Sequence, residues 1–265
     1  MHDRWGRTQN PPMDGSPLTF SRVAPGLSPG SVVASLFIDE YDRDLPRVAI
    51  PRPAVQVVVR FGPTARGGLD VHAFGVQQRV RRKIIRAGQK AVMASLHPGT
   101  AKAVLGVPAD AIADRVIDLD DLWGNAATRK LLDQLATAHS TVDAARILER
   151  VITERAVDAN SSGLVLAAVN RLANANVSTV AADLGVSERH LRRVFKEAVG
   201  VSPKEFAKLT RFQRALRTAH EDSRASWASI AAATGYYDQA HLIGEFHAIS
   251  GVTPRALLSE LSADG

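Results

Sequence analysis

The stretch that decides the fold of the C-terminal part is VSTVAADLGVSERHLRRVF, residues 177–195. Its apolar residues recur at helical spacing on both sides of Gly185, which predicts two helices joined by a tight turn. Gly185 stands where the chain leaves the first helix with positive φ, a conformation that glycine adopts at the least cost. Ser187 is placed to cap the second helix. Ala181 is small, as a close crossing of the second helix requires.

The apolar and basic residues of this stretch separate onto two faces. The face toward a shared core carries Val180, Leu184, Val186, Leu191 and Val194. The outward positions of the second helix are all basic: Arg189, Arg192, Arg193 and Lys196. Cations on the exposed face of such a helix are suited to contact phosphates and guanine in the major groove. The pattern is therefore typical of a helix-turn-helix unit that binds double-stranded DNA.

The same pattern recurs nearer the C-terminus. Residues 226–235, SWASIAAATG, match a first helix in which Gly235 takes the place of Gly185, and residues 236–246, YYDQAHLIGEF, match a second. The second turn is one residue longer, because Leu242 follows its glycine by seven positions and Leu191 follows its own by six. A long helix over Pro203–His220 is predicted to join the units, with proline in its first turn. An alanine-rich hairpin can imitate one unit, but two with a connector favour DNA binding.

These residues resemble a known family. Residues 164–262 are similar to the tandem helix-turn-helix domain of AraC/XylS-type transcriptional regulators. The tracts that match are residues 195–206 (FKEAVGVSPKEF), residues 230–254, and the ending GVTPR at 251–255. The tract Gly106-Val107-Pro108 with Val116–Gly124 resembles the N-terminal region of a subgroup of the family.

The resemblance implies which residues contact DNA. In the first unit they are Arg189, Arg192 and Arg193, with Lys196 near the DNA backbone. In the second unit the family's positions fall on Asp238, Gln239, His241 and Gly244. Gly244 and His247 stand where basic residues are frequent, and Glu245 adds a negative charge. We therefore expect the second unit mainly to orient the domain, with Gln239 and His241 as its readers.

The N-terminal half has the pattern of a small antiparallel sheet or partial barrel. Short runs rich in Val, Ile and Phe are separated by Gly, Pro or Asp, at residues 31–38, 54–61, 69–76, 83–87 and 91–96. We interpret Val57, Val59 and Val71 as sheet core rather than pocket lining. A short helix over Ala109–Asp114 and two amphipathic helices, Ala126–Ala138 and Thr141–Ala156, follow. The last two would either pair across a dimer interface or cover the sheet of their own domain.

The expected fold class is α+β, with a small β-rich N-terminal domain and its helical extension followed by an all-α domain. Residues 1–30 contain five prolines and are predicted to be a disordered tail. Residues 31–160 are predicted to form a sensory or dimerisation domain, and residues 161–262 the DNA-binding domain of two units on one long helix. Asn160–Gly163 is the linker candidate. Four phenylalanines in the second domain have core-like spacing: Phe195, Phe206, Phe212 and Phe246.

The surplus positive charge of the chain does not lie in the helices that are expected to bind DNA. The net charge is +6, but residues 177–265 hold 11 Lys and Arg against 10 Asp and Glu. The densest basic stretch, Arg79–Lys90, lies in the N-terminal half. It is interpreted first as the solvated face and turn of a β-hairpin, and second as a clamp for DNA or an anionic effector.

Several functions are disfavoured by what the sequence lacks. Without cysteine there are no disulfides, thiol nucleophiles or thiolate metal sites. The eight histidines have no metal-ligand spacing, and no phosphate loop or nucleophile elbow is present, so we expect neither an enzyme nor a bound metal or cofactor. No run approaches the roughly 18 apolar residues that span a bilayer, and the N-terminus has no basic-then-apolar signal pattern. We therefore expect a cytoplasmic location and no membrane partner.

The leading hypothesis is a sequence-specific transcription regulator. A small-molecule effector bound to the N-terminal domain would shift an equilibrium between two states. The alternative is a DNA-binding regulator whose N-terminal domain only mediates protein–protein contact. The partners implied are double-stranded DNA, a small-molecule effector, a second copy of the chain and, for an activator, RNA polymerase.

Overall fold

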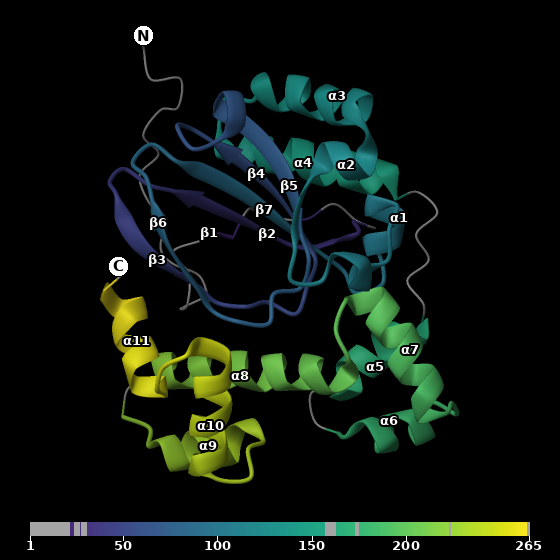
Figure 1. Cartoon of the computed structure of the whole chain (residues 1–265), viewed down its shortest axis with the longest axis vertical. Coiled ribbons are helices and arrows are strands. Elements are labelled where there is room, and N and C mark those ends of the chain that lie inside the picture. Colours follow the sequence, from purple (N-terminus) through teal and green to yellow (C-terminus); the bar gives the residue numbers. More distant parts are fainter. Residues whose placement is uncertain are drawn as a thin grey trace.

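The computed structural model describes residues 22–23, 27, 31–156, 163–172, 175–222 and 224–263. The N-terminal half is built on an antiparallel six-stranded sheet in the order β1-β2-β7-β4-β5-β8, beside a two-stranded ribbon of β3 and β6 (Figure 1). The strands are β1 (Arg22–Val23), β2 (Val33–Glu40), β3 (Leu45–Ala49), β4 (Gln56–Phe61), β5 (Leu69–Phe74), β6 (Arg81–Ile85), β7 (Lys90–Leu96) and β8 (Val116–Asp118).

Alternation along the strands gives the six-stranded sheet two chemically different faces. Val57 lies opposite Ala94, and Val59 lies opposite both Val92 and Val71. These side chains are buried in the apolar core, so the interpretation of the valines as sheet core is confirmed. Arg60 and Asp70, which are the neighbours of Val59 and Val71 along the strands, point to the opposite face.

Helices cover the apolar face of the sheet. Helix α4 packs against β2 and β7, and α3 packs against β5 and α4, so both cover the sheet of their own domain. Figure 1 shows α2, α3 and α4 together on one side of the sheet. The elements are α1 (Ala101–Leu105), the 3-10 helix η2 (Ala109–Ile112), α2 (Leu119–Trp123), α3 (Asn125–Ala136) and α4 (Thr141–Arg155).

Helices are the only regular secondary structure in the described residues of the C-terminal half, which completes the expected α+β arrangement. Helix α8 lies between two groups of helices, α5–α7 at one end and α9–α11 at the other (Figure 1). The helices are α5 (Gly163–Leu172), α6 (Val177–Asp183), α7 (Glu188–Val199), α8 (Pro203–Glu221), α9 (Trp227–Thr234), α10 (Gln239–Ser250) and α11 (Pro254–Ala263). None of the described helices is both long and apolar enough to cross a membrane.

Two expectations for the N-terminal half need correction, and strand β3 was missed. The helix predicted over Ala109–Asp114 is a 3-10 turn that ends at Ile112, because Ala113 has an extended ψ of 137° and Asp114 a left-handed φ of 57°. Strand β3 was not predicted, since Pro46 and Arg47 interrupt its apolar pattern. The basic stretch is not the face and turn of a β-hairpin, because its strand β6 pairs with the distant strand β3, with Arg82 opposite Val48.

Some predicted segments lie largely outside the described residues. From residues 1–30 the structure describes only Leu27 and Arg22–Val23, and that pair forms β1 against β2. From the linker candidate at residues 160–163 it describes only Gly163, the first residue of α5.

The basic stretch Arg79–Lys90 contacts the end of the helical half. The Arg82 guanidinium donates to both carboxylate oxygens of Glu260, at 2.9 and 3.3 Å, and to the carbonyl oxygen of Ser250 at 3.0 Å. The Val80 N–H donates to the Ile249 carbonyl oxygen at 2.9 Å. Since Ile249 and Ser250 end α10, these donors satisfy carbonyls at a helix C-terminus, where a cation is also favoured.

A second contact joins the halves at the other end of α8. Gly200, at the end of α7, has a φ of 99°, and a Cβ there would lie 3.1 Å from the Ala109 carbonyl oxygen of η2. The Gly99 N–H donates to the Ala198 carbonyl oxygen at 3.2 Å. The N-terminal half therefore contacts both groups of helices.

Replacing Gly200 by alanine tests this contact. Gly185→Ala is the matched control, because Gly185 also has a positive φ but has open space around its Cβ direction. We expect Gly185→Ala to lower the free energy of unfolding of the full chain by about 1–2 kcal/mol through backbone strain alone. Gly200→Ala should cost at least about 1 kcal/mol more, because it also overpacks η2. Equal losses in urea unfolding would argue against a close contact at Gly200.

Candidate DNA-binding surface

The first helix-turn-helix unit is formed by α6 and α7. The turn has the predicted geometry: Gly185 has a φ of 66°, and the Ser187 hydroxyl caps α7 by accepting from the His190 N–H at 3.2 Å. The Val186 N–H donates to the Ala181 carbonyl oxygen at 3.0 Å and closes the end of α6. Ala181 is buried, as predicted from its small size.

The second helix of this unit, α7, has a buried face and a basic exposed face. Leu191 and Phe195 are buried, and the ring of Phe195 meets that of Phe206 on α8 edge-on, with 5.3 Å between centroids. All four predicted contact residues are exposed on the opposite side: Arg189, Arg192, Arg193 and Lys196.

Local carboxylates neutralise part of this basic face. Arg192 pairs with Glu188 one turn earlier, and Arg193 lies 3.7 Å from Glu197 one turn later. Among the described residues, Arg189 and Lys196 form no ion pair. Exposed pairs of this kind contribute at most about 1 kcal/mol. A phosphate or a guanine edge can therefore displace either carboxylate at small cost.

The second unit, α9 and α10, repeats this construction with one difference. Gly235 has a φ of 85°, and the Tyr236 N–H donates to Ala231 as Val186 does to Ala181. The cap of α10 is Asp238, which accepts from the His241 N–H at 2.7 Å and lies three residues after the glycine instead of two. The extra residue of the predicted longer turn is Tyr237.

The two readers predicted for the second unit are in different situations. Gln239 is exposed at the start of α10. His241 is exposed as well, but its Nδ1 lies 3.4 Å from the Tyr237 N–H and its Nε2 lies 3.6 Å from Glu245. Its ring also packs edge-on against Tyr236, with 5.4 Å between centroids. Both nitrogens of His241 thus face the protein, whereas the Gln239 side chain has no such partner among the described residues.

Glu245 contributes less negative charge to the surface than its place in the sequence indicates. Its side chain is 14% exposed, and it accepts from Arg211 of α8 at 2.9 Å. Arg211 also lies over the ring of Tyr236, 5.5 Å from the centroid. Burial, followed by the nearby Glu245 carboxylate, raises the pKa of the Tyr236 phenol far above its ordinary value. The phenol therefore stays protonated, and the cluster of Arg211, Tyr236 and Glu245 holds α10 against α8.

The connector α8 fixes the separation of the two units. Ser202 and Glu205 form a capping box at its start, and Pro203 occupies its first turn as predicted. With 19 residues, α8 is roughly 28 Å long. This length is comparable to one helical turn of duplex DNA, roughly 34 Å.

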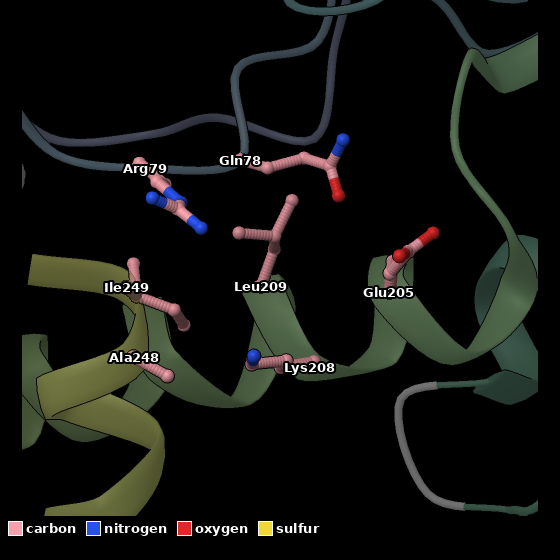
Figure 2. Close-up of a pocket in the computed structure, with 7 residues that line it drawn as sticks. All are labelled: Gln78, Arg79, Glu205, Lys208, Leu209, Ala248 and Ile249. Carbon is pink, nitrogen blue, oxygen red and sulfur yellow. The ribbon is translucent and has the colours of Figure 1, made fainter.

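A cavity of about 200 Å³ lies where the N-terminal half meets α8 and α10. In Figure 2, Gln78 and Arg79 extend from a loop that faces Leu209 on α8 and Ile249 on α10. Lys208 and Glu205 complete the polar part of the lining, with Ala248 beside Ile249. Sequence reasoning missed this cavity, because its residues come from segments more than a hundred positions apart.

A second polar cluster lies on the sheet face opposite the helices. Arg60 binds Asp70 with two hydrogen bonds of 2.8 and 2.7 Å, and His72 lies between Asp70 and Asp118 at 3.0 and 2.7 Å. Asp70 also accepts from the Arg66 N–H at 2.8 Å, and these contacts within the domain favour a structural role. Among the described residues, no group of His, Asp and Glu has the arrangement of a metal site.

The Arg211–Glu245 pair provides a stability test of the second unit. We expect Glu245→Ala to lower the free energy of unfolding by about 2–3 kcal/mol, because it leaves a mostly buried guanidinium without its carboxylate. The double variant Arg211→Met with Glu245→Met should lose less, since no charge remains unpaired. His247→Ala, on the exposed face of α10, is the control and should change stability by less than about 0.5 kcal/mol. Equal losses for the single and double variants in urea unfolding would contradict a coupled pair.

Comparison with known proteins agrees with this geometry. Residues 180–260 match the family model described as "Helix-turn-helix domain". A comparison with curated protein sequences finds no match.

Several solved structures are similar to the chain. The C-terminal domain of AraT, a response regulator from Geobacillus stearothermophilus, is 24% identical, covers 36% of this chain and 84% of its own, and has a TM-score of 0.35. ToxT from Vibrio cholerae is 9% identical, with coverage of 86% and 97% and a TM-score of 0.44. ToxT with a bound unsaturated fatty acid is 9% identical, with coverage of 91% and 96% and a TM-score of 0.40.

Both units have a capped second helix, a glycine turn with positive φ and one exposed face, and they lie at opposite ends of one helix. Residues 180–260 of this chain therefore form a helix-turn-helix domain with two units, as the family model that they match describes.

Proposed function

We propose that the chain regulates transcription by binding specific sites in double-stranded DNA with both helix-turn-helix units. The observation that carries this proposal is the exposed basic face of α7 with Arg189, Arg192, Arg193 and Lys196. On one rigid connector, α7 and α10 would enter successive segments of the major groove.

Different residues would contact the DNA bases and the DNA backbone. Arg192 and Arg193, near the middle of α7, are placed to bind guanine O6 and N7 with two hydrogen bonds. Arg189 and Lys196 would contact phosphates, which position the helix without reading sequence. In the second unit Gln239 would read a base. His241, whose ring nitrogens face Tyr237 and Glu245, would contribute mainly by holding the turn.

We further propose that a small molecule controls this binding from the cavity between the halves. Arg79 and Lys208 line it, and neither forms an ion pair among the described residues. The third charged residue of the lining, Glu205, already accepts from the Ser202 hydroxyl at 2.7 Å. This balance favours an anionic ligand. Because the cavity joins the loop of Gln78 to α8 and α10, its occupant would alter how the N-terminal half holds the second unit.

Two further partners belong to this proposal. A second copy of the chain and, for an activator, RNA polymerase would bind exposed surfaces. If no small molecule binds, the N-terminal half would serve such protein contacts alone.

Replacing arginines of α7 tests DNA binding. A site is first selected from random or genomic duplexes with the full chain. We expect Arg192→Ala to weaken binding to that site by about 1–3 kcal/mol, roughly 5- to 150-fold, and to relax specificity at one base pair. Lys196→Ala should weaken binding to all duplexes by the same factor. It should also lower the slope of log K against log salt concentration by about one.

The control for charge is Arg146→Ala, since Arg146 is an exposed arginine on α4 that pairs with Asp143. Its affinity should equal that of the unchanged chain at the same salt concentration. The proposal fails if the unchanged chain retards no duplex even at low salt, or if Arg146→Ala weakens binding as much as Arg192→Ala does.

A thermal-shift screen of small carboxylates, phosphates and zwitterions tests the cavity. A ligand at about 100 times its Kd stabilises the native state by about 2.7 kcal/mol, which corresponds to a rise in Tm of roughly 5–10 °C. Lys208→Met should abolish that rise, while Lys130→Met, on the exposed side of α3, should leave it intact. A shift that survives Lys208→Met and Arg79→Ala would locate the ligand elsewhere. The absence of any shift would favour the protein-contact alternative.

A further inference from the structure

The two helix-turn-helix units differ by one inserted residue. Up to the glycine their backbones correspond, and in both the next residue donates its N–H to the carbonyl five positions earlier: Val186 to Ala181, and Tyr236 to Ala231. In the first unit the cap follows at once, whereas in the second Tyr237 stands between Tyr236 and the cap Asp238.

Packing does not account for the inserted tyrosine. Tyr236 is buried at the position that Val186 occupies in the first unit, so the apolar slot behind the turn is already filled. Tyr237 is 93% exposed, the most exposed large side chain with apolar character in the described part of the chain. The fold therefore does not require a large side chain at this position.

The backbone at Tyr237 is nevertheless held in place. Its N–H lies 3.4 Å from Nδ1 of His241, and the next residue, Asp238, caps α10. The His241 ring is itself packed against Tyr236. The turn therefore presents the Tyr237 side chain from a constrained backbone, directly before the end of α10 that carries Gln239.

The electrostatics of the second unit indicate what this side chain meets. Helix α10 contains no lysine or arginine, whereas α7 exposes four cations. The N-terminal end of a recognition helix enters the major groove, so the residue just before it lies beside the sugar–phosphate wall. A phenol hydroxyl is a neutral donor that can form a hydrogen bond to a phosphate oxygen there.

We propose that the Tyr237 hydroxyl donates a hydrogen bond to a DNA phosphate at the half-site of the second unit. This inference rests on the proposed DNA-binding function. Tyr237 then supplies a contact to the DNA backbone, which α10 cannot make through lysine or arginine. His241 is the positioning residue that holds the turn. The longer second turn thereby places a phosphate donor ahead of a helix that has no lysine or arginine.

The test compares Tyr237→Phe and Tyr237→Ala in the full chain on the selected duplex. Tyr237→Phe removes only the hydroxyl and should weaken binding about tenfold, since a hydrogen bond to a charged acceptor is lost. Tyr237→Ala should weaken it at least as much. Replacing single phosphates by uncharged methylphosphonates should reveal one position that weakens the unchanged chain but no longer affects Tyr237→Phe. Ile84→Ala is the control, because Ile84 is an exposed side chain, 65% accessible, on β6.

The outcomes separate the two claims. If the unchanged chain binds and Arg192→Ala weakens it, but Tyr237→Phe binds within twofold of the unchanged chain, the role of Tyr237 is overturned while the proposed function stands. The role of Tyr237 is likewise overturned if no methylphosphonate position depends on the hydroxyl. If the unchanged chain binds no duplex, both claims fall together. Because Tyr237 is so exposed, circular dichroism and Tm should be unchanged in both variants.

Discussion

Two aromatic contacts with α8 hold the recognition helices, and the rest of the DNA-binding surface depends on them. Phe195 of α7 packs on Phe206, and Phe246 of α10 packs on Phe212, with centroids 5.3 and 4.6 Å apart. All four rings are buried, as their spacing in the sequence predicted. Since Phe206 and Phe212 lie on one continuous helix, the positions of α7 and α10 are set together. The exposed faces of both helices follow from which faces these rings bury.

The N-terminal half adds contacts that α8 alone cannot provide. Gly200 meets η2 at one end of the connector, and Arg82 binds Glu260 and the end of α10 at the other. Near the middle, Gln213 of α8 donates to the Pro51 carbonyl oxygen at 2.7 Å. The buried apolar residues of both halves form one continuous cluster. These packed groups are the route by which the proposed ligand would act on the second unit.

Charge is placed differently in the two units. In the first, cations lie on the exposed face of α7 beside acids that a phosphate can displace. In the second, Arg211 faces inward to neutralise Glu245, and the exposed positions of α10 are polar or small. In the dense basic stretch of the N-terminal half, Arg82 and Arg86 are paired with Glu260 and Asp44. The first unit therefore exposes more positive charge for the proposed binding to DNA than the second unit does.

Local pattern determined the features whose stability comes from near neighbours. Helix period, the turn glycines, the cap at Ser187 and the outward position of four cations on α7 could be predicted, because each depends on residues within one or two helical turns. Only the tertiary structure decided the pairing of β6 with β3 and the inward turn of Glu245 toward Arg211, which join residues more than thirty positions apart. A short-range pattern indicates which residues are able to be buried. Which of these residues are buried depends on how distant segments pack together in the core.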